Sequence, residues 1–230
     1  MASNFDLAVL VGSLARDPET SVTPNGMEFT TAAFETVRAG GDSSAVTYYR
    51  LVVFNERLAE KLKSYSKGQR LLVTGVLKAV PYKSKAPSDD DDSTAYKGYL
   101  EITVSEIIDP ASEDFSKLLI IGNLGAAPEL KRPGNGERAV ANGTVYVNHR
   151  RGEEKSVTQV RVAAWEKLAD ILMYLKCGSL ALYVSNRFWA TGYFSEKNKQ
   201  PAASINAMVS QLTFLDAIQE TAHDTEDIPF

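Results

Sequence analysis

The chain has 230 residues, of which 44% are apolar and 23% charged, and a formal net charge of −4. This composition excludes a disordered or fibrous protein, and the length suits one large domain or two small ones. Because Cys177 is the single cysteine and the two histidines add no metal-ligand spacing, we expect no disulfide, no metal and no cofactor. No apolar run approaches the roughly 18 residues of a membrane span, and the first residues do not resemble a signal sequence, so we expect a cytoplasmic protein without a membrane partner.

The acidic residues are concentrated in two segments. Residues 216–230 hold five acids and no lysine or arginine, and residues 89–92 are four consecutive aspartates. Without these segments, 20 acidic residues stand against 25 basic ones, so the body of the chain is mildly basic. A basic body with an acidic end predicts an anionic partner and a tail that stays away from it.

A repeated segment divides the chain into two halves. Residues 9–26, VLVGSLARDPETSVTPNG, recur as residues 119–136, LIIGNLGAAPELKRPGNG. The identical residues at an offset of 110 positions are Gly12 and Gly122, Leu14 and Leu124, Pro18 and Pro128, Glu19 and Glu129, Asn25 and Asn135, and Gly26 and Gly136. The repeat predicts two homologous domains at residues 1–110 and 117–216, joined by a linker at 111–116 and followed by a tail at 217–230.

The same order of elements is predicted in each repeat. A short helix follows the third strand, where apolar residues recur at helical spacing before a glycine, as in Leu58, Leu62, Tyr65 and Gly68. Three strands, one helix and two further strands match the Greek-key barrel called the OB-fold. We therefore predict an all-β protein with one short helix per domain, built from two tandem OB-fold five-stranded barrels and a disordered acidic C-terminal tail. Gly12 and Gly122, in mid-strand, predict a bend or bulge in each first strand.

The third strand of each repeat combines an arginine with a large aromatic residue on one face. The alternation places Tyr48, Arg50 and Phe54 there in the first repeat, and Arg161 and Trp165 in the second. In one interpretation Phe54 and Trp165 are barrel-end core residues covered by the helix. In the other, the rings are exposed and stack on unpaired bases, each stack contributing about 1 to 3 kcal/mol. A duplex hides the faces of its bases, so the second interpretation predicts a binder of single strands.

Cations and aromatic rings also alternate along the fourth strand. The residues are Lys78, Tyr82, Lys83 and Lys85 in the first repeat, and Arg187, Trp189 and Tyr193 in the second. The lysines could form an ordinary solvated hairpin loop, or a cationic groove that follows a nucleic-acid backbone. Their alternation with aromatic rings favours the groove.

The last residues lose apolar periodicity and end in DTEDIPF, residues 224–230. The usual interpretation of such an end is a frayed terminus. The alternative is a short linear peptide that places an aromatic ring in a partner's pocket and its acids on basic residues. The alternative assigns partner binding to Asp224, Glu226, Asp227, Ile228, Pro229 and Phe230.

The runs VGSLARDPE, TPNG, YYRLVVFNERLAEKLKSYSKGQRLLVTGVL and DTEDIPF resemble the bacterial single-stranded DNA-binding proteins. The resemblance covers nearly the whole chain, once per half plus the tail, and two OB-folds in one chain resemble the tandem form of the Deinococcus and Thermus group. It implies a homodimer with four OB-folds and a nucleoid-associated location. It also implies protection of single-stranded DNA during replication, recombination and repair, and recruitment of partner enzymes by the tail.

The resemblance also implies roles for individual residues. The family's base-stacking aromatics fall on Tyr48, Phe54 and Tyr82 in the first repeat, whereas in the second only Trp165 matches cleanly and Gln159 replaces another. The long linker usual before the family's tail is nearly missing. The DNA-binding residues expected in total are Arg38, Tyr48, Arg50, Phe54, Lys78, Tyr82, Lys83, Lys85, Arg161, Trp165, Arg187, Trp189 and Tyr193.

Two other classes of function are open on the sequence alone. OB-folds also bind RNA, and preferential binding to RNA over oligo-dT would favour that class, although it does not predict the DTEDIPF ending. An enzyme would need a catalytic motif. The sequence has no phosphate-binding loop, no nucleophile elbow and no metal cluster, so we expect no enzymatic activity.

Overall fold

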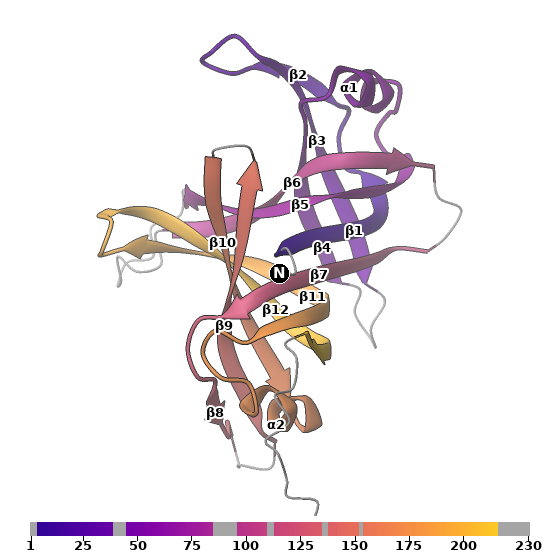
Figure 1. The fold of residues 1–230 in the computed structure, drawn as a ribbon. Coiled ribbons are helices and arrows are strands. Elements are labelled where there is room, and N and C mark those ends of the chain that lie inside the picture. Colours follow the sequence, from indigo (N-terminus) through magenta and orange to yellow (C-terminus); the bar gives the residue numbers. More distant parts are fainter. Residues whose placement is uncertain are drawn as a thin grey trace, which may run out of the picture.

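The computed structural model describes residues 4–38, 45–84, 96–109, 113–134, 138–151 and 154–215. Strands make up most of these residues and each repeat contributes one short helix, which confirms the predicted class. The first repeat lies in the upper part of Figure 1 and the second in the lower part. The predicted acidic tail lies outside the described residues.

The first repeat forms a closed barrel. Its elements are β1 (Phe5–Leu14), β2 (Glu19–Val22), β3 (Glu28–Arg38), β4 (Ala45–Val53), α1 (Glu56–Lys63), β5 (Arg70–Lys83) and β6 (Tyr96–Ile108). Neighbouring strands follow the order β1-β3-β4-β6-β5-β1, and a parallel pairing of β4 with β6 closes the barrel. This is the predicted OB-fold order, with the short β2 added on β3.

The second repeat has the same topology. Its elements are β7 (Phe115–Leu124), β8 (Glu129–Lys131), β9 (Val140–Arg151), β10 (Glu154–Trp165), α2 (Lys167–Met173), β11 (Leu180–Ser195) and β12 (Gln200–Phe214). β10 pairs parallel with β12 and closes this barrel. Because β7 begins at Phe115, the last two residues of the predicted linker 111–116 belong to a strand instead.

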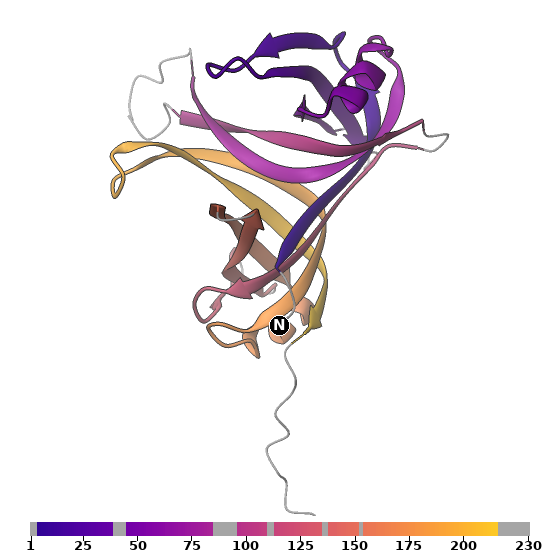
Figure 2. The same ribbon diagram turned by 45° about the horizontal axis from the view of Figure 1, so that its top comes forward.

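The two barrels share one continuous sheet. β1 pairs antiparallel with β7, from Phe5 beside Ile121 to Val11 beside Phe115. This pairing joins twelve strands into a single sheet, and Figure 2 shows β1 and β7 running side by side between the barrels. The repeats are therefore held together by main-chain hydrogen bonds as well as by the chain that links them.

Each barrel has a core of inward-facing apolar residues. Strand alternation buries Leu10, Phe34, Leu51, Leu77 and Ile102 in the first barrel, and Ile120, Val145, Val160, Tyr183 and Ile205 in the second. The helices are short, with eight residues in α1 and seven in α2, and they bury Leu62 and Leu172 against these cores. Neither helix could span a membrane, and the described residues contain no group of side chains suited to a metal ion.

Gly12 and Gly122 lie where the first strand of each barrel approaches its neighbour closely. A Cβ atom at Gly12 would overlap with the carbonyl oxygen of Glu35, and one at Gly122 would lie 2.6 Å from the side chain of Val145. At Gly12, β1 is paired with β5 and begins to pair with β3. Among the described residues, the register shifts that mark bulges lie in the pairings of β5 with β6 and of β11 with β12. Of the predicted bend or bulge, no bulge therefore lies at either glycine, and both serve close backbone approach.

A second contact between the repeats lies where two long hairpins cross. The β5–β6 and β11–β12 hairpins project to the same side in Figure 1, and they touch at Gly98 and Gly192. A Cβ atom at Gly192 would overlap with the main chain of Lys97, and one at Gly98 would lie 3.0 Å from the nitrogen of Gly192. The rings of Tyr96 and Phe194 add to the contact, with centroids 5.7 Å apart. Because the two main chains are in direct contact here, the crossing fixes the position of one hairpin relative to the other.

Candidate nucleic-acid interface

The outer face of the first barrel carries exposed aromatic rings. Tyr48 on β4 is 61% exposed and Tyr82 on β5 is 44% exposed. Tyr99 on β6 lies close to Tyr82, with 6.1 Å between the ring centroids. A groove of about 750 Å³ runs along these rings, and we call it the aromatic groove; its lining residues are Ala15, Arg16, Ala33, Tyr48, Tyr82 and Tyr99.

Cations lie on the same face as these rings. The strand registers place Arg50 beside Glu101, and Glu101 beside Lys78. The Arg50 Nη1 donates a hydrogen bond to the Tyr99 hydroxyl at 3.3 Å and lies 3.7 Å from Glu101 Oε2. Arg50 is exposed, and exposed ion pairs contribute little, so its guanidinium can turn toward a phosphate at small cost.

The aromatic residues at the ends of β4 and β10 differ between the repeats. Phe54 is 47% exposed, which excludes the core interpretation for this residue, and its ring lies 5.7 Å from that of Phe29. Trp165 is half-buried and has the guanidinium of Arg138 over its ring at 5.7 Å. Arg138 is held by Glu166, with 2.8 Å between Nε and Oε1. One face of the Trp165 ring is therefore already occupied.

The other aromatic residues predicted in the second repeat have the same kind of partner. The Arg161 guanidinium lies 5.4 Å from the ring centroid of Tyr193, and that of Arg187 lies 5.9 Å from the ring centroid of Trp189. Trp189 is nevertheless 41% exposed. A cation over an exposed ring is worth about 0.5 to 1 kcal/mol, so a base competes with the guanidinium for that face.

β11 of the second repeat contacts β4 of the first through one pair of aromatic rings. The buried rings of Tyr49 and Phe188 have centroids 6.1 Å apart. Burial raises the pKa of Tyr49, so this hydroxyl stays protonated. Arg187 and Trp189 line a pocket of about 330 Å³ together with Tyr49 and Thr47. The two residues predicted to serve the second repeat thus lie at the boundary between the repeats.

A buried polar pair also connects the repeats. The Asp6 side chain on β1 is 1% exposed, and its Oδ1 lies 3.4 Å from Nε2 of His149 on β9. The same His149 nitrogen lies 3.0 Å from the Thr158 hydroxyl on β10. Desolvation raises the pKa of Asp6, and the nearby His149 opposes that shift. The pair ties the β9–β10 hairpin to the first strand of the other repeat.

The sequence matches a known family over both barrels. Residues 5–100 and 115–215 match the Single-strand binding protein family, and these ranges contain the aromatic groove and the arginine-covered rings. The chain belongs to this family. The predicted resemblance is confirmed, and the repeat found in the sequence corresponds to two copies of the family's domain in one chain.

Similar proteins match this chain over both repeats. The single-stranded DNA-binding protein of Deinococcus radiodurans is 25% identical over 235 residues, which cover 90% of this chain and 75% of the relative. The crystal structure of the wild-type single-stranded DNA-binding protein of Thermus aquaticus has a TM-score of 0.65 at 18% identity and covers 94% of this chain and 95% of its own. A deletion mutant of the same Thermus protein covers 100% of this chain and 98% of its own, with a TM-score of 0.64 and 18% identity. These structures share the fold of the whole chain.

Several predicted residues of this family member lie outside the sites above. Lys83 is exposed at the end of β5, and Arg38 is the last residue of β3. Lys85 and the tail residues Asp224, Glu226, Asp227, Ile228, Pro229 and Phe230 lie outside the described residues. Their roles stay predictions.

Three residues of the interface were missed from the sequence. Tyr99 lies in β6, the last strand of the first repeat, whose existence the sequence predicts. The alternation of Tyr99, Glu101 and Thr103 along this strand would have placed Tyr99 on the outer face. Arg16 lies two residues after the end of β1, and Arg138 lies two residues before β9. Both are in connections without periodicity, so no local signal shows that they meet a ring or a groove.

Proposed function

We propose that this chain binds single-stranded DNA without strong sequence preference, by base stacking on aromatic rings and by contacts of lysine and arginine with the backbone. The aromatic groove is the observation that carries this proposal. Tyr48, Tyr82 and Tyr99 expose ring surface beside Arg16 and Arg50, on the side of the barrel that faces away from its core. Every base has a π-face, so rings accept any sequence, and only an unpaired strand offers those faces.

The proposed role is protection of single-stranded DNA during replication, recombination and repair, in the cytoplasm and at the nucleoid. Binding of this kind needs no catalytic group, so the protein acts as a binder and not as an enzyme. The acidic segment 224–230 contains no lysine or arginine that could bind a phosphate, and we assign this segment to the recruitment of partner proteins.

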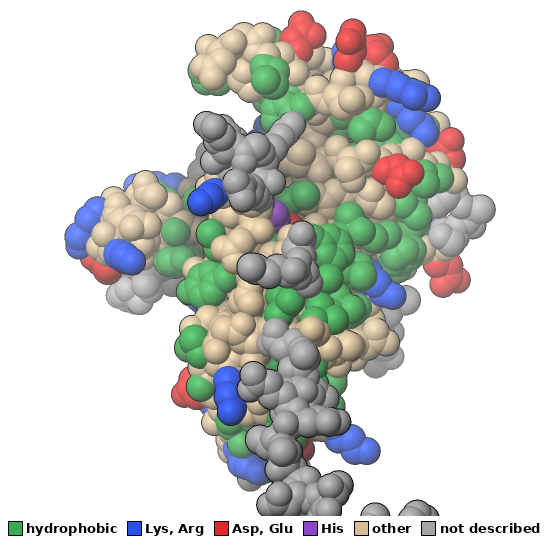
Figure 3. Space-filling view, viewed as in Figure 1, with side chains coloured by type: hydrophobic (Ala, Val, Ile, Leu, Met, Phe, Trp, Pro, Cys, Tyr) green, Lys and Arg blue, Asp and Glu red, His purple; other side chains and the backbone are tan. Residues whose placement is uncertain are grey.

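The proposed assembly is a homodimer with four OB-folds. The outward-facing residues of β1, β7 and β11 form a partly exposed apolar surface, which we call the sheet face; they include Phe5, Leu7, Leu119, Ile121 and Leu182. Figure 3 shows hydrophobic side chains gathered over these strands. β1 and β7 are equivalent strands that run antiparallel, so the face is close to self-complementary, as a two-fold interface between copies requires.

The oligomeric state tests the assembly. The solution mass without DNA should be about twice the chain mass of 25.1 kDa. Ile121→Lys places a charge in the middle of the sheet face and should yield monomers, whereas Val22→Lys, at an exposed apolar residue of β2, should not. A wild-type mass near 25.1 kDa at micromolar concentration would overturn the homodimer.

A titration with oligonucleotides tests the function. Oligo-dT of graded lengths should bind more tightly than duplex DNA of the same length, and the affinity should fall with salt because phosphate contacts release counterions. Equal affinity for duplex DNA contradicts the proposal, and tighter binding of oligo-U than of oligo-dT would assign the chain to the RNA-binding class instead.

The separate role of the tail needs its own experiment. Deletion of residues 225–230 removes two acidic residues and no basic one, so oligo-dT should bind with unchanged or slightly higher affinity. Loss of DNA binding in a truncated protein that keeps its melting temperature would place the tail in the DNA site.

A further inference from the structure

One cross-strand row on the outer face places an arginine beside a different residue in each repeat. The row crosses four strands in the same order in both barrels, and its members are Ala33, Arg50, Glu101 and Lys78 in the first repeat and Thr144, Arg161, Asn206 and Trp189 in the second. The arginine occupies the same place in both rows. Its neighbour on the last strand is an acid in the first repeat and a neutral amide in the second.

In the first repeat, Arg50 lies beside Glu101. The Glu101 side chain is only 19% exposed, and its Oε2 lies 3.7 Å from Arg50 Nη1. The same nitrogen donates a hydrogen bond to the Tyr99 hydroxyl at 3.3 Å. A carboxylate with little solvent contact needs a cation beside it, so it attracts the guanidinium. In the part of the chain that the structure describes, the Arg50 guanidinium lies over no aromatic ring.

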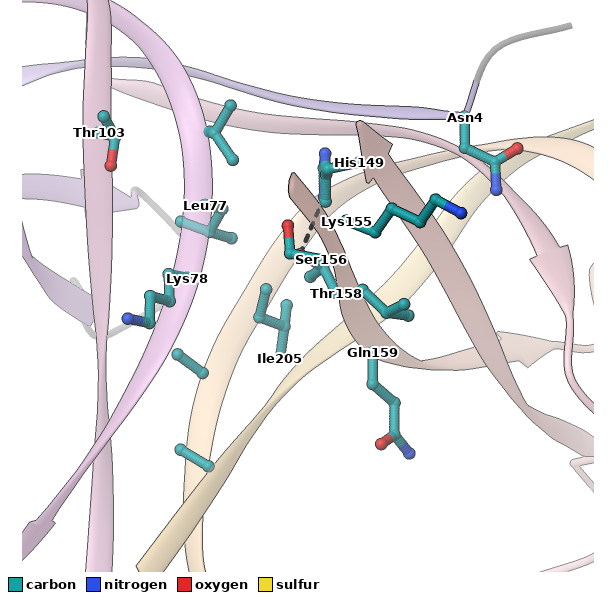
Figure 4. Close-up of a pocket in the computed structure, with 14 residues that line it drawn as sticks. Asn4, Leu77, Lys78, Thr103, His149, Lys155, Ser156, Thr158, Gln159 and Ile205 are labelled. Carbon is teal, nitrogen blue, oxygen red and sulfur yellow. Dashed lines mark hydrogen bonds between the residues drawn. The ribbon is translucent and has the colours of Figure 1, made fainter. Parts of the chain in front are cut away.

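A second cation lies on the other side of Glu101. Lys78 is its register partner on β5. Figure 4 shows the Lys78 side chain at the edge of the cavity between the repeats, extending from β5 toward β6, the strand that carries Glu101 and Thr103. Glu101 is therefore an acid between two cations that we expect to contact phosphates. Such an acid repels an anionic ligand, so its role on this face is not direct contact with DNA.

In the second repeat, the corresponding arginine covers a ring. Asn206 stands in the place of Glu101, and none of the ion pairs in the described ranges includes Arg161. The Arg161 guanidinium instead lies 5.4 Å from the centroid of the Tyr193 ring. Tyr193 is the counterpart of Tyr82, because each lies four residues after the member of the row on its strand, β11 or β5.

The two positions of the arginine are close in energy. An exposed ion pair and a cation over an exposed ring stabilise a protein by similar small amounts. One carboxylate at the neighbouring position is therefore enough to decide where the guanidinium lies. Ser204 stands in the place of Tyr99, so the second repeat also lacks the tyrosine hydroxyl that accepts from Arg50.

We propose that Glu101 is a positioning residue that holds Arg50 off the aromatic groove, so that Tyr82 stays open to a base. Where the acid is missing, in the second repeat, Arg161 covers the corresponding ring. The inference rests on the proposed function, because an open ring matters only if bases stack on it. Glu101 itself contacts no base, and it releases its cation when a phosphate arrives, since the ion pair is weak.

The side-chain NMR signals of the two arginines test their positions without DNA. The ring current shifts the Nε–H signal of a guanidinium over an aromatic ring upfield, and the variants Arg50→Lys and Arg161→Lys assign the two signals. Asn206→Glu adds the missing carboxylate, so the Arg161 signal should lose its upfield shift. Asn206→Gln, the matched neutral control, should keep that shift. In the first repeat, Glu101→Gln should give the Arg50 signal an upfield shift.

A double-mutant cycle with oligo-dT measures the consequence for binding. In the wild type, Tyr82→Leu should weaken binding by about 5- to 150-fold, the range for one stacked base. In the Glu101→Gln background this loss should be smaller by a factor of about 2 to 5, because the ring is then already covered by a cation. Glu106→Gln removes the same charge from an exposed residue of β6, so in that background Tyr82→Leu should weaken binding as it does in the wild type.

The two measurements separate this inference from the proposed function. Melting curves show whether each variant keeps the fold. If either arginine signal stays as in the wild type in folded Asn206→Glu or Glu101→Gln, the positioning role is overturned, and oligo-dT binding by the wild type still supports the proposed function. An equal loss for Tyr82→Leu with and without Glu101→Gln also overturns the positioning role. If the signals move as expected but the wild type fails to bind oligo-dT, the proposed function falls and the positioning of Arg50 stands.

Discussion

The two repeats share a topology but present their aromatic residues differently. In the first, Tyr48, Phe54 and Tyr82 expose between 44% and 61% of their surface. In the second, Trp165, Trp189 and Tyr193 each have a guanidinium over the ring, and all three such contacts among the described residues are in that repeat. The first repeat therefore offers exposed rings that no described cation covers, and the second offers rings that already have a cation over one face.

This difference assigns different shares of binding to the repeats. A base that stacks on a bare ring gains the full stacking energy, whereas one that displaces a guanidinium gains only the surplus. The displaced guanidinium is then free to meet a phosphate. We infer that stacking dominates in the first repeat and charge in the second.

The largest expected effect comes from removing the bare rings. Tyr48→Ala and Phe54→Ala should each weaken oligo-dT binding by about 1 to 3 kcal/mol, and Trp165→Ala by less. Titrations at a single salt concentration, with melting curves for each variant, measure this. A loss for Trp165→Ala that exceeds both others, without a change in melting temperature, would reverse the ranking of the repeats.

The buried carboxyl group between the repeats gives the next effect. Because the pKa of Asp6 is raised in the folded state, its protonation favours folding, and this contribution is lost as the pH rises through the raised value. At neutral pH Asp6→Asn should therefore raise the stability by about 1 kcal/mol, or the melting temperature by about 2 to 4 °C for a chain of this size. The gain over the wild type should shrink toward acidic pH. A less stable variant at neutral pH would mean that the attraction between Asp6 and His149 exceeds the cost of burying the charge.

The N-terminal ends of the two helices also differ, and this difference should be visible in the stability of the protein. Asn55 caps α1, with its side chain accepting a hydrogen bond from the Leu58 nitrogen at 3.0 Å. The corresponding Glu166 makes no such bond and has a φ of 53°. Asn55→Ala should lower the free energy of unfolding by about 1 kcal/mol.

Glu166→Gly should raise the free energy of unfolding by a similar amount. The substitution releases backbone strain of about 1 to 3 kcal/mol but removes the exposed ion pair with Arg138. Denaturant unfolding measures both, and a destabilised Glu166→Gly would show that the ion pair matters more than the strain.

The smallest expected effect concerns the covered ring itself. Both tryptophans lie in the second repeat, so oligo-dT should quench the emission through Trp165 and Trp189 alone. Arg138→Ala uncovers one face of Trp165 and should deepen the quenching, with a change in affinity of about 0.5 to 1 kcal/mol or less. Unchanged emission during tight binding would mean that neither indole meets a base.

The local parts of this structure could be predicted from the sequence. The spacing of Leu58 and Leu62 gave α1 its place, and the alternation around Tyr48 and Arg50 gave β4 its outer face. These patterns reflect neighbours a few residues apart, which the sequence contains directly.

The contacts between the repeats could not be predicted in the same way. The pairing of Leu7 with Leu119 and the crossing at Gly98 and Gly192 join residues about a hundred positions apart. Strand alternation shows which side chains point outward from a barrel, but it does not show which part of the other repeat lies opposite them. The contacts of Arg138 with Trp165 and of Arg161 with Tyr193 also join separate parts of the second repeat, whereas Arg187 and Trp189 lie two residues apart on β11.

The crossing of the hairpins sets a limit on how alike the two halves of this chain can be. One extra residue in β11, Asn186, changes the offset to 111, so the strand registers make Pro81 the counterpart of Gly192. A proline at position 192 would place its Cβ atom in the space that the main chain of Lys97 fills. A chain made of two identical copies of the first half could not close into this arrangement, so at this position the tandem architecture itself required the duplicated halves to diverge.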